Sequence, residues 1–104
     1  MLLYMKGFIY MLKSISSPLC YVGSSKTSIY RRLSDHKYDY KRFLDNKYHW
    51  ISSFEIIKLN DYCIKLVDTI EADDIDELKK LLKVKEKFYI NSLNTVNIYM
   101  KDKV

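Results

Sequence analysis

Two short runs of β-branched and aromatic residues near the start of the chain constrain its fold most tightly. Residues 7–13 and 19–23 both have the composition of β-strands, and the second run ends at Gly23. Between them, residues 14–18 supply serine hydroxyls, which bond to nearby backbone, and a proline with a fixed φ. We therefore predict an antiparallel hairpin with a loop of about five residues.

The helical spacing of apolar residues predicts two long helices. The first is expected over about residues 29–44, with Thr27 or Ser28 as its N-cap. The second is expected to start at residues 72–74, where acidic side chains suit the positive end of the helix dipole. The buried stripes are predicted to comprise Ile29, Leu33, Tyr40, Phe43 and Leu44 in the first helix and Ile75, Leu78, Leu82, Tyr89 and Leu93 in the second.

The middle of the chain is expected to complete the sheet. Residues 52–59 have the composition of a third strand, and a turn signal follows at residues 60–61. Residues 62–70 continue as a fourth strand or as a short extended segment, and the pattern does not decide between the two. The sequence thus predicts an α/β (α+β) protein with a small three-stranded antiparallel sheet flanked by helices, in one domain spanning residues 1–104.

Positive charge is concentrated in the first half of the chain. Residues 1–50 hold nine Lys/Arg against three Asp, a net charge of +6. Residues 51–104 hold nine Lys against ten Asp/Glu, a net charge of −1. This segregation favours a polyanionic partner such as nucleic acid, and a basic surface that serves only solubility is the alternative.

Several other classes of protein are excluded by the sequence. Cys20 and Cys63 lack metal-type spacing, so we expect small buried residues in a reducing compartment. The apolar start is interrupted by Lys6 and Gly7, and no run approaches the roughly 18 apolar residues that span a bilayer. No phosphate-loop or dinucleotide motif is present, so no organic cofactor is expected. We expect a soluble intracellular protein of the cytoplasm or nucleus.

Two tyrosines occupy related places in the predicted hairpin. Tyr10 ends the segment Gly7-Phe8-Ile9-Tyr10, and Tyr21 begins the segment Tyr21-Val22-Gly23. Adjacent antiparallel strands bring two phenols into one pocket when both face the same side. There a phenol can relay a proton or bond a phosphate oxygen, although packing on the sheet is the alternative. Gly23 is expected to supply a positive φ or a close backbone approach to substrate.

Arg32 and His36 are four residues apart and therefore share one face of the first helix. A fixed guanidinium can neutralise the charge that builds on phosphate oxygens during cleavage. Arg31 is adjacent and competes for this role. The alternatives are a solvated surface charge for each arginine and a structural role for His36.

Glu86 interrupts the apolar face of the last helix, beside Leu82, Tyr89 and Ile90. A buried carboxylate without a partner is unfavourable, and a bound divalent cation would offset that cost. Magnesium suits a site with one carboxylate, several waters and phosphate oxygens. The alternative is an edge position with an ion pair to Lys79 or Lys83.

Taken in order, these segments resemble the GIY-YIG nuclease family over about residues 7–97. The resemblance implies the GIY-YIG endonuclease fold and a metal-dependent DNA endonuclease in which Tyr10 or Tyr21 activates the attacking water. Arg32 would stabilise the transition state and His36 would position the reacting groups. Glu86, in Glu86-Lys87-Phe88-Tyr89-Ile90, matches the family's metal-binding glutamate and would hold one Mg²⁺ or Mn²⁺ ion.

DNA is the partner that the resemblance implies, and no separate DNA-recognition domain is expected. The alternative is a catalytically inactive module on the same fold that binds nucleic acid or recruits a partner. A homodimer would explain two cuts across a duplex, and the Lys, Ile, Asn and Tyr bias suits an AT-rich viral, phage or mobile-element genome. The residues expected to contact DNA are Gly23, Lys26, Arg31, Lys37, Lys41 and, as the counterpart of the family's final asparagine, Asn97.

Overall fold

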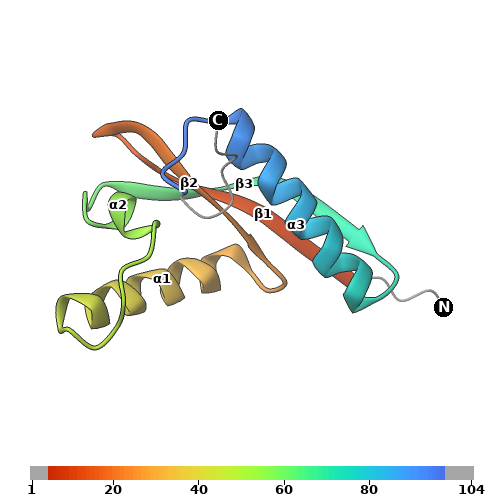
Figure 1. Cartoon of the computed structure of the whole chain (residues 1–104), viewed down its shortest axis with the longest axis horizontal. Helices are drawn as coiled ribbons and strands as arrows, with labels where there is room; N and C mark the ends of the chain where they lie inside the picture. Colours follow the sequence, from red (N-terminus) through yellow and green to blue (C-terminus); the bar gives the residue numbers. More distant parts are fainter. Residues whose placement is uncertain (1–4, 98–104) are drawn as a thin grey trace.

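A three-stranded antiparallel sheet forms the centre of the protein in the computed structural model, which describes residues 5–97. The strands are β1 (Met5–Ser14), β2 (Ser17–Ser25) and β3 (Tyr62–Ala72), and their order in the sheet is β2-β1-β3. The first strand is therefore central and is paired on both sides (Figure 1). The predicted α+β class and the three-stranded antiparallel sheet are confirmed.

The hairpin between β1 and β2 is tighter than predicted. Ser14 pairs with Ser17, which leaves a two-residue turn, so the expected loop of about five residues is wrong. The serines close the turn: the Ser16 N–H donates to Ser14 Oγ at 2.9 Å, and both hydroxyls donate to Asp61. Pro18 lies within β2 beside a register shift, as an edge strand allows for a residue without an N–H.

Helices cover both faces of the sheet, and the central strand β1 is therefore buried on both sides. Successive side chains of a strand point to opposite faces, and Ile9 and Tyr10 are both fully buried. Helix α3 (Ile75–Ser92) packs on the face of Ile9, whereas α1 (Ile29–Leu44) and α2 (Phe54–Ile57) pack on the face of Tyr10 (Figure 1).

The two long helices begin at caps that hydrogen-bond the first turn. Ser28 Oγ accepts from the Tyr30 N–H, and the Asp74 side chain accepts from the Glu77 N–H. Of the predicted buried stripes, Leu78 and Leu82 are buried, whereas Leu44 is 61% exposed. Ile75 and Leu93, at the two ends of α3, are also exposed, because a helix end extends beyond the sheet that its centre covers.

The predicted strand at residues 52–59 is wrong, because residues 54–57 form the short helix α2. Consecutive residues Ile56 and Ile57 are both buried, as is Phe54, and this pattern does not fit the alternation of a half-buried strand. The third strand is β3, so the undecided segment 62–70 belongs to the sheet. Cys63 on this strand is exposed, contrary to expectation, while Cys20 is buried. Within residues 5–97, no helix combines the length and apolar character of a membrane span.

Candidate active site

Tyr10 and Gly23 face each other across the hairpin and form the centre of the site. They are partners in the β1–β2 register. A Cβ atom at Gly23 would overlap the hydroxyl and ring of Tyr10, so the phenol can lie over β2 only because this position is glycine. The close approach at Gly23 is thus made by Tyr10. Of the two roles predicted for Gly23, a positive φ or a close backbone approach to substrate, the first is wrong, since no glycine in the described part of the chain has a positive φ.

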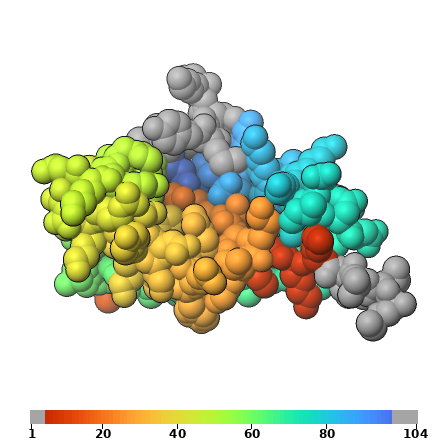
Figure 2. Space-filling view, turned by 90° about the horizontal axis from the view of Figure 1, so that it is seen from below, coloured from red at the N-terminus to blue at the C-terminus, as the bar shows by residue number. Residues whose placement is uncertain are grey.

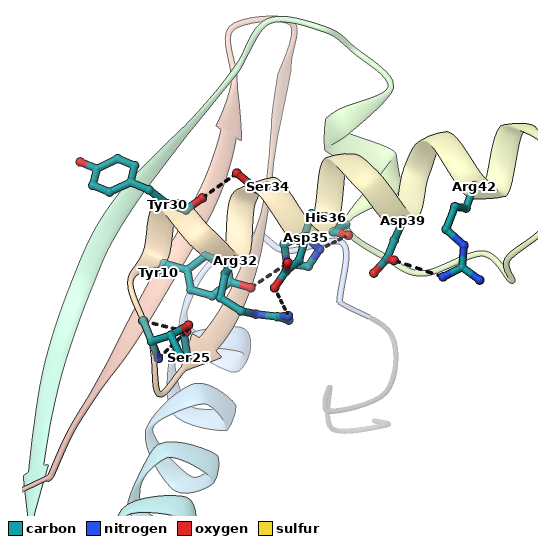
Figure 3. Close-up of polar contacts among 11 residues, drawn as sticks. Tyr10, Ser25, Tyr30, Arg32, Ser34, Asp35, His36, Asp39 and Arg42 are labelled. Carbon is teal, nitrogen blue, oxygen red and sulfur yellow. Dashed lines mark hydrogen bonds and ion pairs between the residues drawn. The ribbon is translucent and has the colours of Figure 1, made fainter.

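Buried hydrogen bonds join Tyr10 to two elements on the same face of the sheet. Tyr10 Oη lies 2.7 Å from His36 Nε2, and His36 Nδ1 lies 2.9 Å from Ser53 Oγ. Figure 3 shows the His36 ring reaching from α1 towards Tyr10. Ser53 precedes α2, and its hydroxyl makes no capping bond to that helix. One imidazole therefore links β1, α1 and the start of α2.

The His36 imidazole is neutral at pH 7. Burial lowers the pKa of His36 to about 4, and the positive charge of Arg32 acts in the same direction, against a smaller effect of Asp35. A neutral imidazole donates from one nitrogen and accepts at the other. Tyr10 and Ser53 can therefore satisfy the two nitrogens.

Tyr21 lies beside this pair and completes an aromatic cluster. Its ring centroid is 6.4 Å from that of Tyr10 and 5.3 Å from that of His36, which it meets edge-on. The Tyr21 side chain is partly exposed, whereas Tyr10 is fully buried. Burial, followed by the charge of Glu86, raises the pKa of Tyr21 to about 12, while Arg32 acts in the opposite direction. Both phenols thus face one site.

Arg32 projects from the start of α1 towards the phenols. Burial alone would lower the pKa of Arg32, but Tyr10, Tyr21 and Asp35 outweigh it and raise that pKa, so the guanidinium is charged. One guanidinium nitrogen lies 3.6 Å from a carboxylate oxygen of Asp35 (Figure 3). Burial raises the pKa of Tyr10, and Arg32 opposes this through its charge and a hydrogen bond.

A cavity of about 500 Å³ opens next to these residues. It lies where the end of β2 meets the start of α1 and the middle of α3, and Figure 2 shows the end of β2 in orange between α1 in yellow and α3 in cyan and blue. Four cations and one carboxylate line it. The lining residues are Ser24, Ser25, Lys26, Thr27, Arg32, Lys79, Leu82, Lys83 and Glu86. This surplus of positive charge suits a phosphate group.

Glu86 supplies the carboxylate of the cavity. Burial raises the pKa of Glu86, while hydrogen bonding from Ser24 and the charge of Arg32 act in the opposite direction. None of the ion pairs found among residues 5–97 includes Glu86, so the predicted alternative of a pair with Lys79 or Lys83 is not adopted. A half-buried carboxylate at the wall of a cavity with room for water fits a hard divalent cation.

The carboxylate would hold such an ion without a second acidic ligand. Residues 5–97 contain no group of three or more His, Cys, Asp or Glu that could enclose a metal. The remaining ligands would be waters and phosphate oxygens, as magnesium often has in phosphate-handling sites.

The residues expected to contact DNA take three different positions. Lys26 lines the cavity. Arg31, Lys37 and Lys41 are exposed on α1 and do not line it. The Asn97 amide lies on the backbone of β2: its Oδ1 accepts from the Val22 N–H at 2.9 Å, and its Nδ2 donates to the Val22 carbonyl at 2.7 Å.

Two residues of the site, Ser53 and Ser24, were not predicted from the sequence, and Lys79 and Lys83 were predicted only as ion-pair partners of Glu86. Nothing in the sequence indicates that Ser53 contacts His36, because the two residues are 17 positions apart and residues 52–59 are predicted to form a strand. Ser24 directly follows the second tyrosine motif, which was the available signal. Lys79 and Lys83 lie seven and three residues before Glu86, and this helical spacing places them beside its carboxylate.

Comparison with known proteins gives a family match that covers this site. The family model described as the GIY-YIG catalytic domain matches residues 6–99. No curated protein and no solved structure matches the chain. The matched range contains both tyrosines, Arg32, His36 and Glu86.

Proposed function

Because the chain belongs to the GIY-YIG catalytic domain family, a family of nucleases, we propose that it is a divalent-metal-dependent DNA endonuclease. The observation that supports this most is the basic cavity that Arg32 and Glu86 share: neither phenol lines this cavity, but the charges of both residues act on Tyr10 and Tyr21. The substrate would be a phosphodiester of DNA, and the reaction its hydrolysis.

Arg32 would bind the scissile phosphate. Its guanidinium is charged, is held by Asp35 and lines the cavity, so it can donate to a non-bridging oxygen as negative charge builds there. The lysines of the same cavity would bind neighbouring phosphates as point charges, without reading bases.

Glu86 would hold one Mg²⁺ or Mn²⁺ ion. Bound there, such an ion would supply Lewis acidity to the phosphate and offset the effect of the carboxylate on the Tyr21 phenol. The hydrogen bond from Ser24 would orient the carboxylate oxygens towards the cavity.

Tyr21 would take the proton of the attacking water. Tyr10 is fully buried and bonded to His36, so solvent reaches only the partly exposed Tyr21. Tyr21, as the phenolate that Arg32 and the hydrogen bond from Tyr10 stabilise, would accept the proton of the attacking water as the water oxygen attacks phosphorus, and would release that proton to solvent afterwards. With Tyr10 donating to Tyr21, His36 Nε2–H would donate to Tyr10 Oη and Ser53 Oγ–H would donate to His36 Nδ1, which the separations of 2.7 Å and 2.9 Å allow.

Substitution of Glu86 tests the proposal directly. We expect wild-type protein to nick plasmid DNA with Mg²⁺ and to lose this activity in excess chelator. Glu86→Ala should reduce cutting by about a hundred- to a thousandfold or more, while DNA binding, measured by fluorescence anisotropy, changes less than about threefold.

Glu77→Ala is the matched control, because Glu77 is an exposed glutamate of the same helix outside the cavity. It should cut DNA like the wild type. Cleavage by Glu86→Ala at the wild-type rate would remove the role proposed for this carboxylate. Wild-type protein that binds DNA but does not cut it under any metal condition would favour the inactive binding module instead.

A further inference from the structure

The outer face of α1 carries large exposed rings away from the cavity. Tyr30 is 69% exposed and Tyr38 is 64% exposed. They are eight residues apart, which is about 12 Å along a helix and little more than two turns. Figure 3 shows the Tyr30 ring pointing away from the fold. Neither ring contributes to the two hydrophobic clusters of the core.

Basic side chains surround these rings. Helix α1 holds five Lys/Arg against two Asp, a net charge of +3. Helical rotation places Lys37 and Lys41 on the side of Tyr30, and Arg31 on the side of Tyr38. Both acids of the helix are already in ion pairs, at 3.6 Å for Asp35 with Arg32 and 3.9 Å for Asp39 with Arg42. The outer face is therefore strongly positive.

One of the two rings already takes part in stacking. The Arg42 guanidinium carbon lies 5.7 Å from the centre of the Tyr38 ring and 4.9 Å from that of Tyr48. Tyr48 in turn stacks on His49 with centroids 4.3 Å apart. Arg42 thus contacts the Tyr38 ring, and most of the Tyr38 ring remains open to solvent.

We propose that the outer face of α1 binds single-stranded DNA, with bases stacked on Tyr30 and Tyr38 and phosphates bound by Arg31, Lys37 and Lys41. Every base has a flat π-face, and stacking on exposed rings is the way in which proteins hold single strands without reading sequence. Bases within a duplex are already stacked on one another, so these rings select for unpaired DNA.

The position of α1 connects this surface with the cavity. Arg32 near its start lines the cavity, and the helix runs away from there towards Tyr38 and Arg42. This inference rests on the proposed function in one respect: the strand on α1 would be an unpaired arm of the DNA that is cut at the cavity. The preferred substrate would then be a duplex with a single-stranded arm.

Binding to oligonucleotides tests the surface independently of cleavage. Fluorescence anisotropy in excess chelator would compare a mixed-sequence single strand of about ten nucleotides with a blunt duplex. We expect Tyr30→Ala/Tyr38→Ala to weaken single-strand binding about 25-fold or more, at about fivefold or more for each ring, and to change duplex binding less than about twofold.

Three matched variants distinguish the stacking of bases on Tyr30 and Tyr38 from two other effects. These are the attraction of phosphates by positive charge and the general effect of removing an exposed ring. Tyr30→Phe/Tyr38→Phe should bind like the wild type, because the ring stacks and not the hydroxyl. Phe88→Ala, which removes a 58% exposed ring from α3, should also bind like the wild type. Lys37→Ala/Lys41→Ala should lower the slope of log affinity against log salt by about 1.4 for the single strand, whereas the tyrosine variants leave it unchanged.

Unchanged single-strand affinity of Tyr30→Ala/Tyr38→Ala would overturn the proposal, and so would an equal loss for single strand and duplex. A wild-type preference for cutting a forked duplex over a blunt one, lost in this variant, would extend the result to catalysis. If no DNA is cut at all, the proposed function fails, while the binding measurements still decide what α1 holds.

Discussion

Gly23 and Ser53 determine where the Tyr10 phenol and the His36 imidazole lie. Gly23 leaves the space that the Tyr10 ring occupies over β2. Ser53, fully buried, bonds the nitrogen of His36 that faces away from Tyr10. Neither residue has a side chain suited to phosphodiester cleavage in this arrangement, yet both position side chains that belong to the candidate site.

Gly23→Ala should therefore damage both stability and activity. Its new methyl group would overlap the Tyr10 hydroxyl and ring, and overpacking of this kind typically costs about 1–3 kcal/mol. Displacement of the phenol would also break the 2.7 Å contact with His36 and reduce DNA cleavage. Urea unfolding and a plasmid-nicking assay would measure the two effects.

Gly7→Ala is the control at the other glycine. Its methyl group would lie 2.7–3.0 Å from Cδ1, Cδ2 and Cγ of Leu82, a side chain whose shift breaks none of the hydrogen bonds of the candidate site. We expect a smaller loss of stability and cleavage close to that of the wild type. A Gly23→Ala protein as stable and active as the Gly7→Ala protein would contradict the steric role assigned to Gly23.

At the scale of the element, α3 combines a core face with a polar edge. Leu78, Leu82 and Ile90 are buried against the sheet. Lys79, Lys83 and Glu86 line the cavity, at positions that lie side by side on an α-helix. The packing of the apolar face therefore sets the position of the charged edge against Arg32 on α1.

Lys79→Ala/Lys83→Ala should weaken DNA binding without selecting among sequences, because lysines at a phosphate act as point charges. For a duplex, the slope of log affinity against log salt should fall by about 1.8, at about 0.9 for each phosphate contact. Anisotropy titrations over a range of salt concentrations would measure this slope.

Lys80→Ala/Lys85→Ala carries the same change in charge on the same helix, outside the cavity. This control variant should lower the slope of log affinity against log salt by clearly less than Lys79→Ala/Lys83→Ala does. Equal slopes for the two double variants would show that only net charge matters and that the cavity holds no phosphate.

At the scale of the whole molecule, the candidate site lies at the end of the edge strand β2, where residues from the layers on both faces of the sheet can reach it. The phenols lie on the α1 face and Glu86 comes from the opposite layer, so the end of β2 is where they can approach each other. The segment after α3 bonds to the outer edge of β2, through a bridge between Cys20 and Thr95 and through the Asn97 amide at Val22. This edge is thereby held in place beside the cavity.

The buried imidazole makes global stability depend on pH. Folded His36 has a pKa of about 4, below its ordinary value of 6.5, so the unfolded chain binds this proton first as the pH falls. The contribution of neutral His36 to the free energy of unfolding is complete above about pH 6.5. It is lost as the pH falls from about 6.5 to 4, by at most about 3 kcal/mol. Urea unfolding from pH 7 to 4 would measure this loss.

His36→Gln is the comparison protein, because it lacks the titrating imidazole while all the carboxylates are retained. The wild type should lose stability more steeply than this variant as the pH falls. Direct NMR titration of the His36 ring provides a second measurement. Parallel stability curves together with an imidazole pKa near 6.5 would contradict the burial argument.

Local sequence patterns were sufficient for the elements that form by local rules. The first helix was predicted over 29–44 and spans Ile29–Leu44, because Ser28 caps it and its apolar spacing is regular. The segment at 52–59 was predicted wrongly, because a short helix there is set by packing on the sheet and not by strand composition. The hairpin turn was misjudged because Asp61, distant in sequence, holds its serines.

The sequence by itself determined the α+β class, the family and the residue types of the candidate site, since spaced motifs and helical periodicity are local properties. The tertiary structure alone decided that Tyr10 lies over Gly23, that Ser53 holds His36 and that Lys79 and Lys83 share a cavity with Arg32. These contacts join residues from different elements. They depend on how helices pack on the two faces of the sheet, and that packing is fixed by the whole core at once.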